Sequence, residues 1–330
     1  MSRFTYVCKP GLLIVIFTLL LAACSSAPAE PAGKEAANPK PAEQTAQQPT
    51  TKKFKGENGE IEVPAQPKRI VAITFLGDLL ALGVKPVGAG SLALENSVLL
   101  EKELQGVVNV GDVSMEKVLE LTPDLIIVPS YLPAENIENL SKIAPTVSIV
   151  SSGFSGGDPL EELKKIGSLI GKEAEADAFI ARYKQKAAEA KEKIAKVIGP
   201  QETVGSYSIW AKNIWVWPTG RDANYNLLQM FGLKPQDKIK ADIVDTGQAK
   251  DISLEVLPQY AADHMFITVY EPAGGKERAK ELMEGPVWKN IPAVGKKHVY
   301  LLNYKEFWMT DGLNLEKQLD ILVKTVGAGN

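Results

Sequence analysis

Histidine and cysteine are scarce in this 330-residue chain, which contains two of each. The histidines, His264 and His298, are too few for a histidine-rich zinc or manganese site, and their apolar neighbours predict ordinary core or edge residues. Two cysteines exclude a disulfide-rich scaffold. The formal net charge of −3 gives no basis for nucleic-acid binding. With 45% hydrophobic and 23% charged residues, the composition is that of a globular protein.

Catalytic motifs are also missing. The chain contains no G-x-S-x-G elbow, no H-E-x-x-H motif and no Walker phosphate loop. This favours a binding protein over an enzyme. One alternative of another class stays open, a secreted carbohydrate-active hydrolase in which Asp222 and Asp311 are the paired acids and tryptophans form the sugar platform.

The N-terminal segment has the layout of a secretory signal peptide over residues 1–23, with basic residues before a short apolar run. The run ends in Leu-Ala-Ala followed by Cys24, which resembles a bacterial lipobox. Residues 25–52 contain no valine, isoleucine, leucine or aromatic residue, so they cannot bury enough apolar surface to fold. We therefore predict a lipid on Cys24 and a disordered tether over 24–52, which would anchor the protein at the outer face of the cytoplasmic membrane.

Short apolar strands alternate with short helices on both sides of a long helical region, which predicts an α/β fold with mainly parallel sheets. We expect an N-terminal lobe over residues 53–157, connecting helices over 158–198 and a C-terminal lobe over 199–330. The apolar side chains of 172–198 recur at alternating intervals of four and three, as one face of a helix requires.

Two pairs of segments repeat in the same order along the chain. They are Leu79–Pro86 with Leu228–Pro235, and Ser114–Asp124 with Ser253–Asp263. An apolar strand follows the aspartate in the second pair. This predicts two similar lobes joined by one long helix, with a ligand cleft between them.

The aromatic residues are unevenly distributed. All five tryptophans follow residue 200, and three of them lie within eight positions. Trp215 and Trp217 share one face of a predicted strand, and the turn after them carries Arg221 to the strand's end, where ligands of open sheets bind. A guanidinium beside aromatic faces suits a planar or anionic oxygen ligand, although Trp215 would fit a core equally well. The predicted ligand-binding residues are Trp215, Trp217, Arg221, Tyr225, Trp308 and, from the first lobe, Tyr131.

Several segments together resemble the substrate-binding lipoproteins of bacterial ABC importers for iron–siderophore complexes, the helical-backbone class of periplasmic binding proteins. These segments are Pro67–Ala72, Leu82–Gly88, Ser114–Ile127 and Pro286–Val294. The resemblance implies a monomer that captures a ferric siderophore and delivers it to a dimeric permease. It implies no cofactor and no metal ligand from the protein, because the siderophore carries the iron. By position, Glu116 and Glu255 would dock onto permease arginines.

Within that family, the stretch 215–221 and the pair Phe307-Trp308 look like those of hydroxamate-siderophore binders. Anionic catecholate or citrate chelates call for several cleft cations, whereas Arg221 is the obvious candidate here and Lys212 a weaker one. This favours a near-neutral ferric hydroxamate. Another iron chelate (catecholate or citrate), haem or a corrinoid stays as the alternative cargo, and a free metal ion would need more histidines.

Overall fold

The structure, a computed structural model, describes residues 50–155 and 157–328. The predicted signal peptide, the lipidated Cys24 and almost all of the predicted tether lie outside the described residues. Thr51 and Lys52 belong to the first strand, so the folded part begins two residues before the predicted boundary. Within the described residues, no helix is both long enough and apolar enough to span a membrane.

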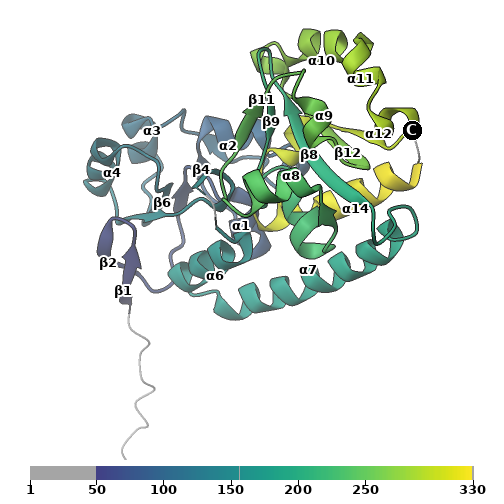
Figure 1. Cartoon of the computed structure of the whole chain (residues 1–330). Helices are drawn as coiled ribbons and strands as arrows, with labels where there is room; N and C mark the ends of the chain where they lie inside the picture. Colours follow the sequence, from purple (N-terminus) through teal and green to yellow (C-terminus); the bar gives the residue numbers. More distant parts are fainter. Residues whose placement is uncertain (1–49, 156, 329–330) are drawn as a thin grey trace, which may run out of the picture. The chain divides into compact units, whose positions relative to one another are not determined.

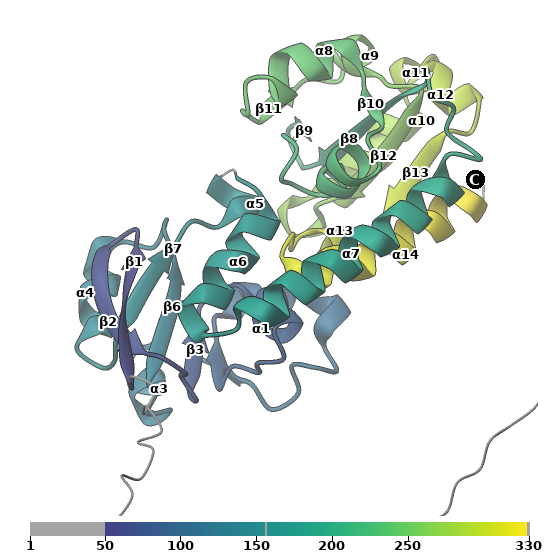
Figure 2. The same cartoon turned by 90° about the horizontal axis from the view of Figure 1, so that it is seen from below.

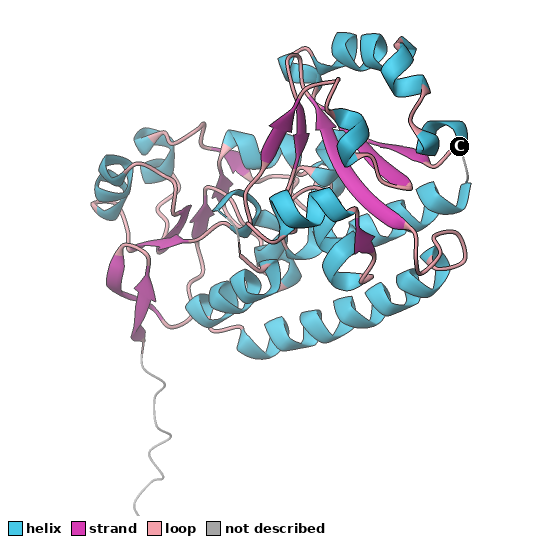
Figure 3. Ribbon diagram, in the orientation of Figure 1, coloured by secondary structure: helices cyan, strands magenta, loops and turns pink. Residues whose placement is uncertain are grey.

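The N-terminal lobe contains a five-stranded parallel sheet in the order β5-β4-β3-β6-β7. Helices flank the strands (Figures 1 and 3). Strand β6, which lies between β3 and β7, is buried along its whole length, as its run of aliphatic residues predicts. An antiparallel hairpin, β1 (Thr51–Gly56) with β2 (Gly59–Pro64), precedes the sheet. The other elements are β3 (Ile70–Ala72), α1 (Leu76–Ala81), β4 (Gly88–Ala89), α2 (Ser91–Asn96), η1 (Val98–Leu100), β5 (Val108–Asn109), α3 (Met115–Glu120), β6 (Leu125–Pro129), α4 (Ala134–Ser141), β7 (Thr146–Ile149) and α5 (Ser152–Ser155).

Two helices connect the lobes, α6 (Pro159–Ile170) and α7 (Glu173–Ile194). Asp158 caps α6 by accepting a hydrogen bond from Leu160 N at 2.8 Å, and Gly171 ends it with a φ of 71°, which favours glycine. The 22 residues of α7 span about 33 Å at 1.5 Å per residue. Its buried face contains the predicted apolar stripe from Ala176 to Ile194, so the period-based prediction is confirmed within the helix. The predicted stripe also included Val197, which is wrong, because the helix ends at Ile194 and Val197 is 41% exposed.

The C-terminal lobe contains a mixed sheet in the order β11-β9-β8-β12-β13, with β10 pairing to the start of β8. Strands β8, β12 and β13 are parallel, whereas β9 and β11 are antiparallel additions. The four residues between β8 and β9 are too few for a parallel crossover and make a hairpin instead. The elements are β8 (Thr203–Ile209), β9 (Ile214–Val216), η2 (Tyr225–Met230), β10 (Lys234–Pro235), α8 (Asp237–Ile239), η3 (Lys240–Val244), β11 (Lys250–Ile252), α9 (Leu257–Tyr260), β12 (His264–Val269), η4 (Glu271–Ala273), α10 (Gly275–Glu284), α11 (Pro286–Lys289), α12 (Pro292–Gly295), β13 (Val299–Leu302), α13 (Tyr304–Phe307) and α14 (Gly312–Ala328).

The aspartates that end the second pair of repeated segments, Asp124 and Asp263, occupy equivalent places in the two lobes. Asp124 precedes β6 and accepts hydrogen bonds from Lys68 N and Arg69 N, just before the neighbouring strand β3. Asp263 precedes β12 and accepts hydrogen bonds from the backbone and hydroxyl of Thr203, where β8 begins. Each aspartate fixes the register of a parallel pair in its own lobe. The prediction of two similar α/β lobes is confirmed.

The last helix, α14, departs from the predicted division. It was assigned to the C-terminal lobe, yet it packs along α7 and also contacts α1 of the first lobe (Figure 2). Its buried stripe joins a hydrophobic core that runs through both lobes, and the stripe consists of Leu315, Leu319, Leu322 and Val326. Helices α7 and α14 therefore run side by side between the lobes, and their packing stiffens the connection.

Candidate ligand-binding site

Aromatic side chains cluster where β8, β12 and β13 end. Trp210 follows β8 and stacks on Tyr270, which follows β12, with ring centroids 4.2 Å apart. Tyr270 in turn stacks on Trp308, at 5.1 Å. This is the edge at which parallel sheets bind ligands, because the carboxyl ends of the strands meet there. The stacked rings form a continuous aromatic wall on the C-terminal lobe, made of Trp210, Trp215, Trp217, Tyr270, Tyr304 and Trp308.

Arg221 lies between two tryptophans of this wall. Its guanidinium carbon is 4.8 Å from the centroid of Trp217 and 4.7 Å from that of Trp308. Strand β9 ends just before Trp217, and a turn closed by the Arg221 N–H to the Pro218 carbonyl (3.2 Å) carries the arginine back over the ring. The side chain is only 7% exposed. The structure thus brings together Trp217, Arg221 and Trp308 as predicted.

The charge of Arg221 survives this burial. Desolvation lowers the pKa of Arg221, while the neighbouring Asp222 carboxylate raises it. An arginine has so high an ordinary pKa that it stays protonated near neutral pH. Asp222 is itself held by hydroxyls, since it accepts hydrogen bonds from Ser208 (2.5 Å) and Thr268 (3.3 Å). The site therefore presents a fixed, desolvated cation between two π faces.

Trp215 joins the same wall. Its ring stacks on Trp217 with centroids 5.1 Å apart and meets Trp210 edge-on at 6.4 Å. The indole nitrogen of Trp217 is buried and has no hydrogen-bond partner among the described residues. An indole N–H of this kind can donate to an oxygen of a ligand lying against the wall.

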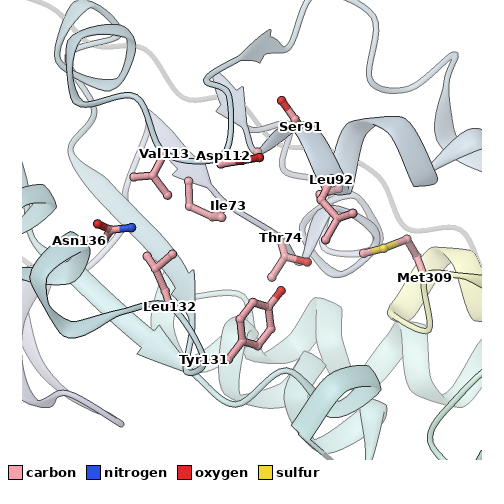
Figure 4. A pocket seen from close by; sticks show the side chains of 12 residues that line it. Ile73, Thr74, Ser91, Leu92, Asp112, Val113, Tyr131, Leu132, Asn136 and Met309 are labelled. Carbon is pink, nitrogen blue, oxygen red and sulfur yellow. The ribbon is translucent and has the colours of Figure 1, made fainter. Parts of the chain in front are cut away.

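The N-terminal lobe provides most of the lining of an apolar cavity of about 350 Å³, and Met309, from the segment before α14, completes it (Figure 4). Its lining includes Ile73, Leu92, Val113, Tyr131 and Met309. Tyr131 follows β6 and is 48% exposed, and the charge of Arg221 acts on it by lowering the pKa of its hydroxyl, against a larger rise caused by burial. The structure thus places the predicted Tyr131 in the lining of this cavity. Sequence reasoning missed the aliphatic residues, because single aliphatic side chains after strands carry no distinctive signal.

A second cavity, of about 540 Å³, is bounded by both lobes. Ser152 and Gly153 line it from the first residues of α5, and the segment from Trp217 to Arg221 lines it from the other lobe. Arg221 donates a hydrogen bond from Nη1 to the Gly153 carbonyl at 3.1 Å. The cleft between the lobes therefore includes the predicted Arg221 and is lined by residues of both lobes.

Tyr225 does not join this group. It is 4% exposed, it belongs to the hydrophobic core between the lobes, and its hydroxyl donates to Asp158 Oδ1 at 2.6 Å. The predicted contact between Tyr225 and ligand is therefore not supported. The segment η2 is a π-helix, whose extra residue per turn shifts the direction of side chains relative to the pattern expected of an α-helix.

Glu116 and Glu255 lie away from the cavities, both exposed. Glu116 is in the first turn of α3, which Ser114 caps through a hydrogen bond from Lys117 N. Glu255 is in the turn before α9, and the Ser253 hydroxyl lowers its pKa. The structure thus shows both glutamates exposed, one on each lobe, and their docking role stays a prediction.

The acids of the hydrolase alternative are not paired. Asp222 and Asp311 are 4% exposed each and line two different small cavities. Asp311 accepts hydrogen bonds from Gly77 N (2.8 Å) and from the Asn314 side-chain amide (2.6 Å), so both of its oxygens already have partners within the protein. Burial raises the pKa of both carboxyls. No water-accessible pair of acids is formed by these two residues.

Comparison with known proteins agrees with this geometry. Residues 71–305 match the model of the periplasmic binding protein family. The iron(3+)-hydroxamate-binding protein YxeB of Bacillus subtilis is 36% identical over 316 residues, covering 94% of this chain and 93% of its own. A FhuD-fold component of a ferrichrome ABC transporter from Bacillus subtilis is 33% identical with a TM-score of 0.74, covering 83% of this chain and 99% of its own. FhuD2 from Staphylococcus aureus, solved with bound ferrioxamine B, is 25% identical with a TM-score of 0.69, covering 79% and 98%. This chain belongs to the periplasmic binding protein family.

Proposed function

We propose that this protein is the substrate-binding component of an ABC importer and captures a ferric siderophore of the hydroxamate type between its lobes. One observation carries the proposal: the buried Arg221 guanidinium lies between Trp217 and Trp308 at the cleft. The names of YxeB and of the ferrioxamine-bound FhuD2 support the same class of cargo.

The geometry suits a compact iron chelate. The indole rings offer flat apolar faces to its organic shell, and Arg221 donates charge-assisted hydrogen bonds to hydroxamate oxygens. The siderophore's own oxygens hold the iron, so the protein supplies no ligand to that iron and needs no cofactor to bind the chelate. The apolar cavity of the first lobe receives the aliphatic part of the chelate.

The charge of the cleft favours a near-neutral cargo. Among the described residues that line the two cavities beside Tyr131 and Arg221, the arginine is the one cation, and Asp112 is an acid. A multiply anionic catecholate or citrate chelate would leave most of its charge uncompensated in such a site. Haem or a corrinoid would find the same aromatic wall, so both enter the test as competitors.

The remaining roles follow from the surface and the N-terminus. Glu116 and Glu255 meet basic residues of a dimeric permease, one on each lobe. A lipid on Cys24 holds the protein, as a monomer, at the outer face of the cytoplasmic membrane. The protein acts by binding and release and catalyses no reaction.

A fluorescence titration tests the cargo. Ferrioxamine B and ferrichrome, added to the purified protein, quench tryptophan emission with micromolar or tighter affinity, because the cargo lies against the wall. The same siderophores without iron are the controls, because they lack the compact shape that the iron imposes. Tighter binding of a ferric catecholate, ferric citrate, haem or corrinoid would replace the hydroxamate assignment, and no response to any of these would remove the function.

A further inference from the structure

A second cluster of side chains lies at the opposite ends of the same three strands. Glu202 immediately precedes β8, His264 is the first residue of β12, and His298 immediately precedes β13. One ligand atom from each of these residues lies within 4.8 Å of the others. The two histidines are the only ones in the sequence, and no pattern along the chain predicts that they lie side by side.

Hydrogen bonds already hold two of the three side chains. His264 is fully buried, with Nε2 3.1 Å from Glu202 Oε2 and Nδ1 3.1 Å from the Tyr300 hydroxyl. Glu202 Oε2 also accepts a hydrogen bond from Gly199 N at 2.7 Å.

His298 has a buried ring nitrogen, Nδ1, that lacks a hydrogen-bond partner among the described residues. Its ring stacks on that of His264, with centroids 4.1 Å apart and an interplanar angle of 9°. A buried ring nitrogen without a partner is costly, and a ligand that gives it one is favoured.

We propose that Glu202, His264 and His298 form a binding site for a divalent transition-metal ion of the zinc, copper or nickel type. Two imidazoles and one carboxylate are the ligands that such ions prefer, whereas magnesium and calcium prefer all-oxygen sites. The ion takes the place of the hydrogen bond between His264 Nε2 and Glu202, so the single proton of the neutral His264 ring stands on Nδ1 and no net proton is released. His264 Nδ1–H then donates to the Tyr300 oxygen, and Gly199 N–H holds Glu202, which are the outer hydrogen bonds typical of metal ligands.

Because the rings of His264 and His298 are stacked, one of them must turn before both can bind the same ion. Parallel rings direct their lone pairs side by side, so they cannot both point at one ion. His264 is fixed on both nitrogens, so His298, which is only partly buried, is the ring that turns. The Glu202 side chain is 35% exposed, which leaves room for water in a fourth coordination position. Binding therefore breaks the histidine stack.

This site is separate from the cleft. His264 and Tyr270 stand at opposite ends of β12, about 20 Å apart at the rise of an extended strand. An ion here contacts no cargo. It joins the amino ends of three neighbouring strands and stabilises the folded lobe by mass action.

Titration of the untagged protein with zinc chloride tests the site. Calorimetry is expected to show one equivalent bound, and proton NMR to show both histidine Cε1–H signals shifting or broadening, with a higher melting temperature. Magnesium and calcium give none of these changes. Failure to bind zinc at submillimolar concentrations overturns the proposal.

Two variants locate the ion. H298A and E202Q are each expected to weaken zinc binding by more than about tenfold. The glutamine keeps an acceptor for Gly199 N, so E202Q retains the local fold and is the decisive variant if H298A does not fold. R221A is the matched control and binds zinc as the wild type does, while siderophore binding is unchanged in E202Q. Wild-type zinc affinity in E202Q would overturn the assignment.

Discussion

Asp78 and Asp311 each accept a hydrogen bond from the residue beside the other. Asp78 Oδ1 binds Gly312 N at 2.8 Å, and Asp311 Oδ2 binds Gly77 N at 2.8 Å. These residues stand 234 positions apart in sequence, and they join α1 of the first lobe to the start of α14. This pair of hydrogen bonds therefore holds the first lobe against the last helix of the chain.

Gly77 lies so close to the Asp311 carboxylate that a side chain at this position should destabilise the fold. A Cβ at Gly77 would lie 2.1 Å from Asp311 Oδ1, so G77A must push the carboxylate away. We expect the free energy of unfolding, measured by urea denaturation, to fall by about 1–3 kcal/mol. The control is G327A in α14, where a Cβ meets nothing within 4 Å and helix propensity predicts no loss. Equal stability of G77A and wild type would contradict the close contact of Gly77 with Asp311.

A third buried acid makes the same region sensitive to pH. Burial raises the pKa of Glu162 to about 7, and burial followed by Glu162 raises that of Asp78. A carboxyl whose pKa is raised on folding contributes stability below its unfolded pKa, near 4.5, and that stability is lost as pH rises through about 7. We therefore expect the melting temperature to fall between pH 5 and pH 8.

The substitution E162Q tests this origin of the pH dependence. The glutamine oxygen still accepts from Ser152 N, and its amide is a donor at every pH for Asp78. We expect E162Q to be more stable than wild type at pH 8 by about 1–3 kcal/mol and to show a flatter pH profile in thermal melts. E161Q, at an exposed neighbour, keeps the wild-type slope. An unchanged slope in E162Q would assign the pH dependence elsewhere.

Local patterns explain what the sequence could predict. The apolar period of α7 and the strand-turn-arginine order around Arg221 depend on neighbours in the chain, and both proved correct in the structure. The position of α14 depends on contacts between residues more than 200 positions apart, which no local pattern encodes. The histidine cluster escaped prediction for the same reason, because strand order alone brings His264 beside His298.

The position of Arg221 between two indole rings predicts that ligand binding needs its planar shape as well as its positive charge. R221K keeps the positive charge but loses the planar group that lies between Trp217 and Trp308. We expect R221K and R221A both to weaken ferrioxamine B binding by about 1–3 kcal/mol in fluorescence titrations. K212A is the control, since Lys212 is exposed in the hairpin loop. Wild-type affinity in R221K would mean that charge alone is recognised.

The paired glutamates predict a separation of binding from delivery. Glu116 and Glu255 are exposed and line none of the cavities described above, so the double variant E116A/E255A should bind ferrioxamine B with unchanged affinity. If they dock onto permease arginines, uptake of radiolabelled iron by cells that carry this variant should fall several-fold, because truncating one partner leaves the other charge unpaired. The matched control E135A/E277A removes two other exposed acids and should leave uptake intact. Normal uptake with E116A/E255A would place the permease contact on another part of the surface.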